Sequence, residues 1–384
     1  MDTNNKVMAI VFCGEHYNPL GVIRSLGENG VTPNVIVVKS RTPLASNSKW
    51  IGELTFVDSI EDGYRVLLKK YGEEHRKGSL PFLFTSDDKT TSFLDVHFDE
   101  LNGKFRFFNA GEQGKIVRYM NKDEINKCAL RHGMNVLRTW VVKKGEIPSD
   151  IEYPVITKAI ASTVGGWKAD VHICYSRDEL VEAYSQIEAP DLLLQRYIEK
   201  KNEYCLEGFS VNHGKSVMVT IASSYNYILP DAYSAWMTVR NFDNPEVEKN
   251  LDAMFDEIGF EGIFETEFLV DKTGKLWFCE INFRNSTWSY ASTRAGMPLP
   301  ILWMKYMESG AIDKKATYRQ IPDNFTAMVE LNDYLYRVKT GNVNFFKWLG
   351  ELRDCNCLYF LGKNDPHPLI GMFTSKVKRV LKRA

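Results

Sequence analysis

The sequence has no run of apolar residues long enough to cross a membrane, because none approaches the roughly 20 residues that a spanning helix needs. Its N-terminus carries a short apolar run that breaks into polar residues, without the cleavage region of a secretory signal peptide. Cysteine is sparse, and the seven residues are scattered through apparent strands and helices, which is not a secreted disulfide framework. We therefore expect a cytoplasmic protein without a transmembrane segment.

An excess of charge of one sign is also missing. The 48 lysines and arginines nearly balance the 49 aspartates and glutamates, so there is no global basic field for nucleic acid. Cys355 and Cys357 are the only closely spaced cysteines, and no second Cys/His pair at zinc spacing accompanies them. Gly14 and Gly21 do not make the GxGxxG fingerprint of dinucleotide binding. A nucleic-acid partner, structural zinc and a dinucleotide cofactor are therefore not expected.

The composition that remains is that of an ordinary globular protein, 44% hydrophobic and 25% charged. At 384 residues the chain exceeds the size at which one core usually keeps growing, so two or three subdomains are expected. The first part alternates apolar strands with helices, which predicts a doubly wound α/β domain. Strands are expected at 7–12, 35–38 and 81–85, and helices at 19–29 and 60–71.

Five side chains are candidates for contacts with substrates. Asp87 and Asp88 follow the strand at 81–85, at the edge where open α/β sheets bind ligands, although capping of the next helix is the alternative. Arg240 lies in an aromatic segment and could meet an anion or a neighbouring carboxylate. Ser286 and Trp288 lie just beyond a predicted strand that ends near residue 282.

A lysine on a strand and a loop of small residues suggest a phosphate site. Lys158 lies among apolar residues in the strand expected at 154–159, and the loop that follows contains Ser162, Thr163, Gly165, Gly166 and Lys168. Glycines let the backbone approach a phosphate, and N–H groups and lysines supply positive charge. Lys122 starts the helix expected at 121–132, where a cation is unfavourable; a phosphate partner would explain it, and so would solvation.

The strand expected at 192–198 leaves this region and is followed by Glu203. Backbone groups at such an exit could meet the edge of an adenine, and Glu203 could accept hydrogen bonds from ribose hydroxyls.

A predicted β-hairpin within residues 260–294 carries the strongest signal. Its strands place Glu267 and Glu280 on one face as cross-strand neighbours, with Asn282 further along that face and Arg284 at the strand's end. Mg²⁺ prefers oxygen ligands, and Arg284 would offset phosphate charge. A solvated acidic hairpin edge is the alternative. An unpaired carboxylate in an apolar, aromatic strand is costly, so we favour a nucleotide–magnesium centre.

Residues 370–384 alternate apolar and basic side chains, as in a basic amphipathic helix. Such a helix can lie on anionic lipid, or its apolar stripe can dock on the protein. We favour docking because the stripe is short, and peripheral membrane contact stays open.

Together these segments resemble the ATP-grasp superfamily up to about residue 310. The motifs are PVITKA, STVGGWK, LLLQRYI with a following glutamate, and ETEFLVDKTGKLWFCEINFR, in the family's order. The narrower similarity is to carbamoyl-phosphate-synthase-like and D-aspartate-ligase-like carboxylate–amine ligases, although Phe283 replaces the family's common proline. The resemblance implies an N-terminal α/β domain (1–118), a small ATP-grasp subdomain (119–199) and a C-terminal α+β subdomain (200–318). A C-terminal extension (319–384) would follow.

The resemblance also implies roles for individual residues. Lys158 and Lys122 would bind phosphates, the loop with Gly165 and Gly166 would be a flexible lid, and Arg284 would stabilise the transferring phosphoryl group. The implied metal ligands are Glu267, Glu280 and Asn282. The implied adenine and ribose contacts are Gln195, Arg196, Tyr197, Ile198 and Glu203.

The family's usual reaction is a two-step ligation that uses ATP and Mg²⁺, with Mn²⁺ as an alternative. A carboxylate attacks the γ-phosphate, and an amine then displaces phosphate from the acylphosphate. The expected partners are therefore a small-molecule carboxylate and an amine, one of them an amino acid or similar compound. Two alternatives are an ATP-binding regulatory protein that does not ligate and a kinase that stops at phosphoryl transfer.

Overall fold

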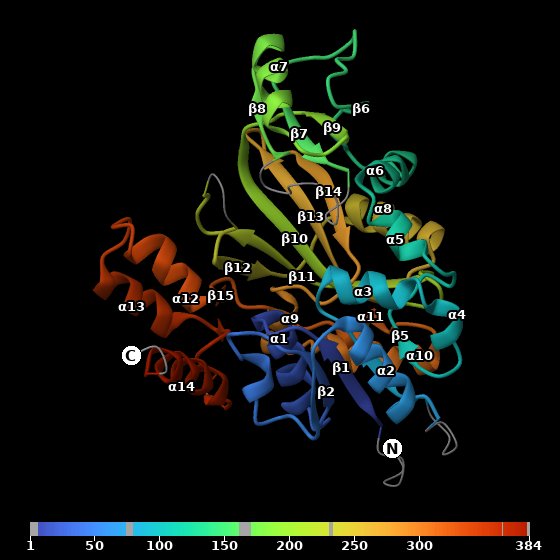
Figure 1. Ribbon diagram of the computed structural model, residues 1–384, viewed down its shortest axis with the longest axis vertical. Helices are drawn as coiled ribbons and strands as arrows, with labels where there is room; N and C mark the ends of the chain where they lie inside the picture. Colours follow the sequence, from blue (N-terminus) through green and yellow to red (C-terminus); the bar gives the residue numbers. More distant parts are fainter. Residues whose placement is uncertain (1–6, 74–79, 161–169, 230–232, 363, 382–384) are drawn as a thin grey trace.

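A computed structural model describes residues 7–73, 80–160, 170–229, 233–362 and 364–381. The described strands form three sheets. In Figure 1 a parallel sheet lies at the bottom, a small antiparallel sheet lies at the top, and a large sheet runs between them. None of the helices found in these ranges is both long and apolar enough to span a bilayer.

The N-terminal sheet is parallel, with the order β3-β2-β1-β4-β5. Its strands are β1 (Ala9–Cys13), β2 (Asn34–Val38), β3 (Leu54–Val57), β4 (Phe82–Phe84) and β5 (Arg106–Phe107). The helices around it are α1 (Tyr17–Gly27), η1 (Ala45–Asn47), α2 (Ile60–Tyr71), α3 (Asp88–Asp95) and α4 (Phe98–Leu101). Alternate residues of β1 enter different cores: Val11 packs with α1, whereas Phe12 packs with α2. Because both faces of the sheet are covered, the predicted doubly wound domain is confirmed.

The small sheet is antiparallel, with the order β6-β9-β7-β8. Its elements are β6 (Thr139–Lys143), β7 (Val155–Ala159), β8 (Ile173–Cys174), α7 (Arg177–Gln186) and β9 (Asp191–Arg196). Two helices, α5 (Lys115–Tyr119) and α6 (Lys122–Arg131), precede it. Ser176 caps α7 by accepting a hydrogen bond from the amide of Glu179, and Glu179 bonds back to the amide of Tyr175.

The large sheet has the order β14-β13-β10-β11-β12-β15-β16. Its strands are β10 (Lys200–Val211), β11 (Ser216–Tyr225), β12 (Trp236–Arg240), β13 (Gly262–Asp271), β14 (Leu276–Asn282), β15 (Thr326–Met328) and β16 (Cys357–Leu358). The helices are α8 (Pro245–Ile258), α9 (Ser289–Arg294), α10 (Leu299–Ser309) and α11 (Lys314–Thr317). Gly259 ends α8 in a left-handed conformation, as a C-terminal cap should.

The C-terminal extension is built into the large sheet, so residue 318 is not a boundary between sheets. β15 pairs with β12, and β16 pairs with β15. The helices of the extension are α12 (Glu330–Asp333), the π-helix η4 (Tyr334–Val338), α13 (Phe345–Asp354) and α14 (His367–Leu381). Met372 in the first half of α14 packs on the main core, in agreement with a docked tail. Side chains beyond residue 375 lie outside the described part.

Candidate active site

The acidic hairpin has the predicted pairing. β13 and β14 run antiparallel with Glu267 opposite Glu280 and Glu265 opposite Asn282. Asp271 closes the turn by accepting hydrogen bonds from the amides of Thr273 and Lys275, and Gly274 takes a φ of 89°. Side chains alternate along a strand, so Glu265 and Glu267 share one face with their partners.

This face opens into a cavity of about 440 Å³ to which every part of the fold except the small sheet contributes. The hairpin side is lined by Glu265, Glu267, Glu280, Asn282 and Arg284. The other walls are lined by His16, Tyr17, Asn18 and Asp88 of the N-terminal domain, Lys122 of α6, and Val329, Asn332 and Tyr336 of the extension. Tyr225, Ser286 and Trp288 also line it.

The carboxylates of the cavity have unlike electrostatic surroundings. Lys122 Nζ lies 3.4 Å from Glu280, and its charge lowers the pKa of that carboxyl group. Burial raises the pKa of Glu267, and the neighbouring Glu265 and Glu280 raise it further. Burial likewise raises the pKa of Glu265. A cation would reduce the repulsion between these closely spaced carboxylates. The oxygens of Glu267 and Glu280 are the donors that Mg²⁺ prefers.

Asn282 and Arg284 connect the hairpin to the N-terminal domain. The Asn282 amide nitrogen donates to Glu265 at 3.0 Å and to Glu267 at 2.9 Å, while its oxygen accepts from Arg284 at 3.0 Å. Asn282 as placed therefore holds the carboxylates, and its oxygen faces the arginine. Arg284 Nε donates to Asp88 at 2.6 Å, so the Asp88 carboxylate of the N-terminal domain fixes the orientation of the guanidinium. Asp87 instead caps α3, which is the alternative that sequence left open.

Lys158 lies on β7 and donates to the side-chain oxygen of Gln195 at 2.8 Å. The amide nitrogen of Gln195 in turn donates to Thr139 at 3.1 Å. Burial lowers the pKa of Lys158. The backbone amide of Lys122 bonds to the carbonyl of Ile160, which holds the start of α6 beside the end of β7. The two predicted phosphate lysines therefore belong to adjoining elements.

The other residues of the predicted nucleotide site that the structure describes are not among those that line the cavity. Arg196 is exposed and lies 3.9 Å from Glu152, and the Tyr197 ring packs edge-on against Tyr175. Ile198 is half-buried, whereas Glu203 is largely buried and pairs with Lys200. The predicted lid, with Ser162, Thr163, Gly165, Gly166 and Lys168, lies outside the described residues.

Of the predicted substrate contacts, Arg240 is not brought to the cavity. It ends β12 opposite Ala222, with its side chain exposed. β12 is an inner strand of the large sheet, between β11 and β15, and the substrate contact of Arg240 stays a prediction. Trp288 is buried and lines the cavity, and Ser286 lines it while donating to Glu207.

Sequence reasoning missed two buried glutamates. Glu265 could have been found, because the spacing of Glu265 and Glu267 puts both on one face of the strand. Glu207 on β10 lies opposite Glu265 and accepts from Ser289 at 2.6 Å. Burial raises the pKa of Glu207 to about 7. Nothing in its own segment distinguishes it, because its environment is made by β13 and α9.

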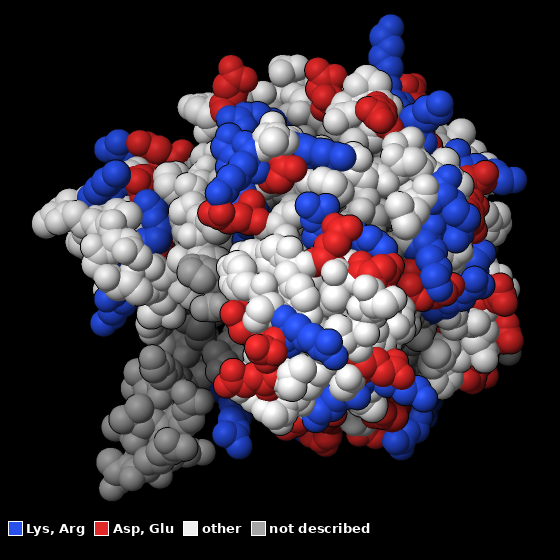
Figure 2. Space-filling view, turned by 90° about the horizontal axis from the view of Figure 1, so that it is seen from above, with Lys and Arg blue, Asp and Glu red and all other residues white. Residues whose placement is uncertain are grey.

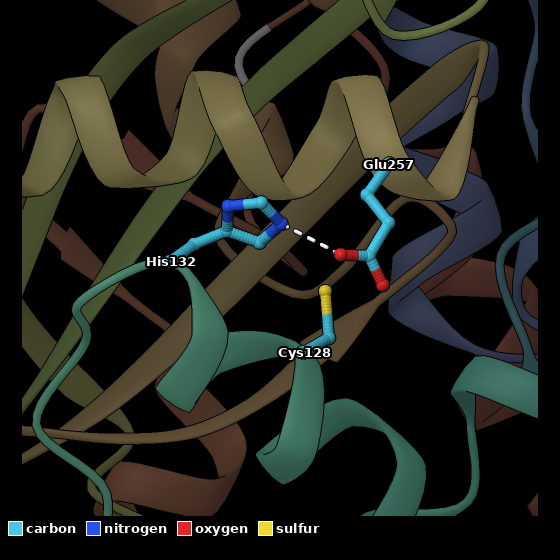
Figure 3. Close-up of side chains that lie close together, drawn as sticks. All are labelled: Cys128, His132 and Glu257. Carbon is cyan, nitrogen blue, oxygen red and sulfur yellow. Dashed lines mark hydrogen bonds and ion pairs between the residues drawn. The ribbon is translucent and has the colours of Figure 1, made fainter.

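A second cluster, Cys128, His132 and Glu257, joins α6 to α8 (Figure 3). Glu257 accepts from His132 at 2.7 Å and Tyr119 at 3.1 Å, and it also pairs with Arg131. These partners, Arg131 first, lower the pKa of Glu257 to about 2, whereas burial raises the pKa of Cys128 to about 12. A protonated thiol and an arginine-paired carboxylate are poor metal donors, so this cluster is better explained as a bridge between helices.

No family model matches the chain. In sequence it is 28% identical over 212 residues to the 2-oxoglutarate carboxylase small subunit of Hydrogenobacter thermophilus, which covers 49% of this chain and 43% of that protein. The chain thus matches less than half the length of this relative.

Solved structures resemble the chain over a larger share of its length. L-amino acid ligase from Bacillus licheniformis has a TM-score of 0.60 and 14% identity, over 79% of this chain and 75% of that one. The biotin carboxylase domain of the Hydrogenobacter thermophilus 2-oxoglutarate carboxylase, in complex with MgADP, ADP and bicarbonate, has a TM-score of 0.60 and 19% identity. That comparison covers 84% of this chain and 74% of the other. At these identities the resemblance shows a shared fold.

Proposed function

The chain has the ATP-grasp fold, and from this premise we propose that it is an ATP-dependent ligase that joins a carboxylate to an amine. One observation carries the proposal: Lys122, Glu267, Glu280 and Arg284 line a single cavity. Cations for phosphate, oxygens for a metal ion and an arginine fixed by another domain are the groups that phosphoryl transfer requires.

We assign the nucleotide to the side of the cavity nearest the small sheet. Lys158 and Lys122 would bind phosphate oxygens, and Glu203 with the segment from Gln195 to Ile198 would contact ribose and adenine. Glu267 and Glu280 would hold Mg²⁺ or Mn²⁺, and the crowding of acids supports a cation there. Asn282, whose oxygen accepts from Arg284, would be the third ligand once that oxygen turns to the ion. When bound, the ion neutralises the phosphates and draws electrons from the transferring phosphorus.

The proposed reaction has two steps. A carboxylate oxygen of the first substrate attacks the γ-phosphorus, the bond between that phosphorus and the bridging oxygen breaks, and ADP leaves. The amine nitrogen of the second substrate then attacks the acyl carbon, the bond to the phosphate oxygen breaks, and the nitrogen loses a proton. Arg284 and the two lysines stabilise the charge that builds up on the phosphoryl oxygens, so no nucleophilic side chain is required.

The substrates would enter from the N-terminal and C-terminal walls of the cavity, near Asp88 and Trp288. An amino acid is our first candidate for one of them. The fold shared with an L-amino acid ligase supports that choice, and the bicarbonate complex of another neighbour makes bicarbonate a carboxylate worth testing.

A screen of amino acids, small carboxylates and bicarbonate for ADP release tests the proposal, with hydroxylamine added to trap an acylphosphate. We expect ADP release that depends on one carboxylate, and a hydroxamate when no amine is supplied. ADP release with a phosphorylated product and no hydroxamate would instead indicate a kinase. Nucleotide binding without ADP release from any pair would indicate a regulatory protein.

A further inference from the structure

The C-terminal extension presents an unusual number of large apolar side chains to solvent. Phe346 on α13 is 78% exposed, and five further side chains are between 45% and 56% exposed. We call the six together the apolar face: Leu335, Phe345, Phe346, Leu349, Ile370 and Phe373. Scattered exposed apolar residues are common, but a group of this size on one small part of a chain needs an explanation.

A chain of contacts connects this face across three helices. Leu335 and Phe373 line one hollow of about 430 Å³ together with Tyr334. Tyr334 packs edge-on against Trp348, and Trp348 stacks on Phe345, which contacts Phe346. Contacts therefore link α14 across η4 to α13, in part through the buried Trp348.

The extension is also the basic part of a nearly neutral chain. Residues 319–384 contain eleven lysines and arginines against six aspartates and glutamates, whereas the whole chain has a net charge of -1. Three of those six acids are buried, namely Glu330, Asp333 and Asp365, and so is the basic residue Arg337. On the projecting left side of Figure 2, where α13 lies, both blue and red side chains are spaced around a white area. Lys347 and Arg353 on α13 are both exposed, and Arg353 pairs with Asp354 at 2.9 Å.

We propose that the apolar face docks on an anionic phospholipid bilayer, with the surrounding lysines and arginines at the level of the headgroups. Aromatic and aliphatic side chains enter the interface while basic residues attract anionic lipid, and a flat bilayer needs no matching shape. A second copy of the chain fits less well, because two basic faces would repel each other. Asn332 lines both the hollow in this face and the cavity of the candidate active site, so the docked face adjoins that cavity.

Flotation of the full chain with vesicles tests this. We expect it to bind vesicles of about one-third phosphatidylglycerol in phosphatidylcholine, to bind pure phosphatidylcholine far less, and to dissociate as salt rises to about 0.5 M. Phe346→Glu and Phe373→Glu should each reduce binding by about tenfold, because each places a charge in the interface. Val181→Glu, at a similarly exposed position on α7, should bind as the wild type does.

Charge is tested by a matched pair of double variants. Lys347→Glu with Arg353→Glu should abolish the preference for anionic vesicles, whereas Arg65→Glu with Lys69→Glu on α2 makes the same change in net charge and should keep it. Absence of wild-type binding, or equal binding by Phe346→Glu, would overturn the proposal. Sedimentation showing a dimer that Phe346→Glu dissociates would replace the bilayer by a second copy. ADP release without vesicles should be the same in all these variants, which separates this test from that of the proposed ligase.

Discussion

At the scale of single residues, the hairpin carboxylates differ because their neighbours differ. Glu280 faces the ammonium of Lys122 and has a lowered pKa, whereas Glu267 faces other acids and has a raised pKa. Glu280 is therefore ionised at neutral pH and available to a cation. A substitution of Glu280 is therefore the most direct test of the proposed metal site.

Glu280→Gln should abolish turnover, because an amide cannot supply the charge that a divalent ion requires. The side chain is partly exposed, so the melting temperature should change little. Steady-state ADP release and thermal unfolding measure the two effects. Glu182→Gln on the exposed surface of α7 is the matched control. Wild-type rates in Glu280→Gln would contradict the metal assignment.

Asp88→Asn should lower kcat/KM by about tenfold, because the Asp88 carboxylate orients Arg284 through a charge-assisted hydrogen bond. The asparagine oxygen can still accept from Arg284, so the effect should be smaller than that of removing the arginine. Asp99→Asn, an exposed change on α4, is the control. Unchanged kinetics in Asp88→Asn would mean that the N-terminal domain does not position the guanidinium.

The part of the site that depends on local periodicity could be predicted from the sequence. Glu267 and Glu280 were paired correctly because side chains alternate along a hairpin and the turn residues set its register. Glu207 and Asn332 were not found, because they reach the site only through the packing of segments far apart in sequence. Arg240 does not line the cavity for the same reason, because a charged residue near aromatics does not reveal which side of a sheet it will occupy.

At the scale of elements, helices with a clear apolar pattern were predicted to within a few residues, as for α2 and α6. β15 and β16 were not predicted. Strands of three and two residues carry no periodicity, and only the pairing of β15 with β12 and of β16 with β15 makes them strands. The joining of α6 to α8 through Glu257 is equally invisible in sequence, because its partners lie more than 120 residues away.

Glu257→Gln should destabilise the protein by about 1–2 kcal/mol at pH 7, because its partners on α6 lose a carboxylate. The folded-state pKa of about 2 is depressed, so this stabilisation is complete above about pH 4.5 and is lost as pH falls towards 2. Urea unfolding at pH 7 and pH 3 should therefore show a smaller difference between variant and wild type at pH 3. Glu248 lies on the same helix as Glu257 and forms an exposed pair with Lys314 of α11. Glu248→Gln should therefore change the free energy of unfolding little at either pH. A difference independent of pH would contradict the ionic bridge.

At the scale of the whole molecule, the extension closes the fold back on the N-terminal domain. Arg24 on α1 pairs with Asp365 at 3.1 Å, and both side chains are 1% exposed. Arg24 also donates to the carbonyl of Tyr359, and Asp365 accepts from Ser48. The extension also forms one wall of the candidate active-site cavity. The buried ion pair between Arg24 and Asp365 therefore helps to position that wall.

Asp365→Ala should destabilise the protein by about 3–5 kcal/mol, because it leaves the Arg24 charge buried without its carboxylate. Asp58→Ala, which removes an exposed partner of Lys39, should cost less than about 1 kcal/mol. Thermal unfolding measures both, and limited proteolysis should release the extension earlier in Asp365→Ala. Arg24→Met combined with Asp365→Leu should recover much of the loss, since no charge is then stranded. A double variant as unstable as the single one would mean that hydrogen bonds to Ser48 and Tyr359, and not the paired charge, hold the extension in place.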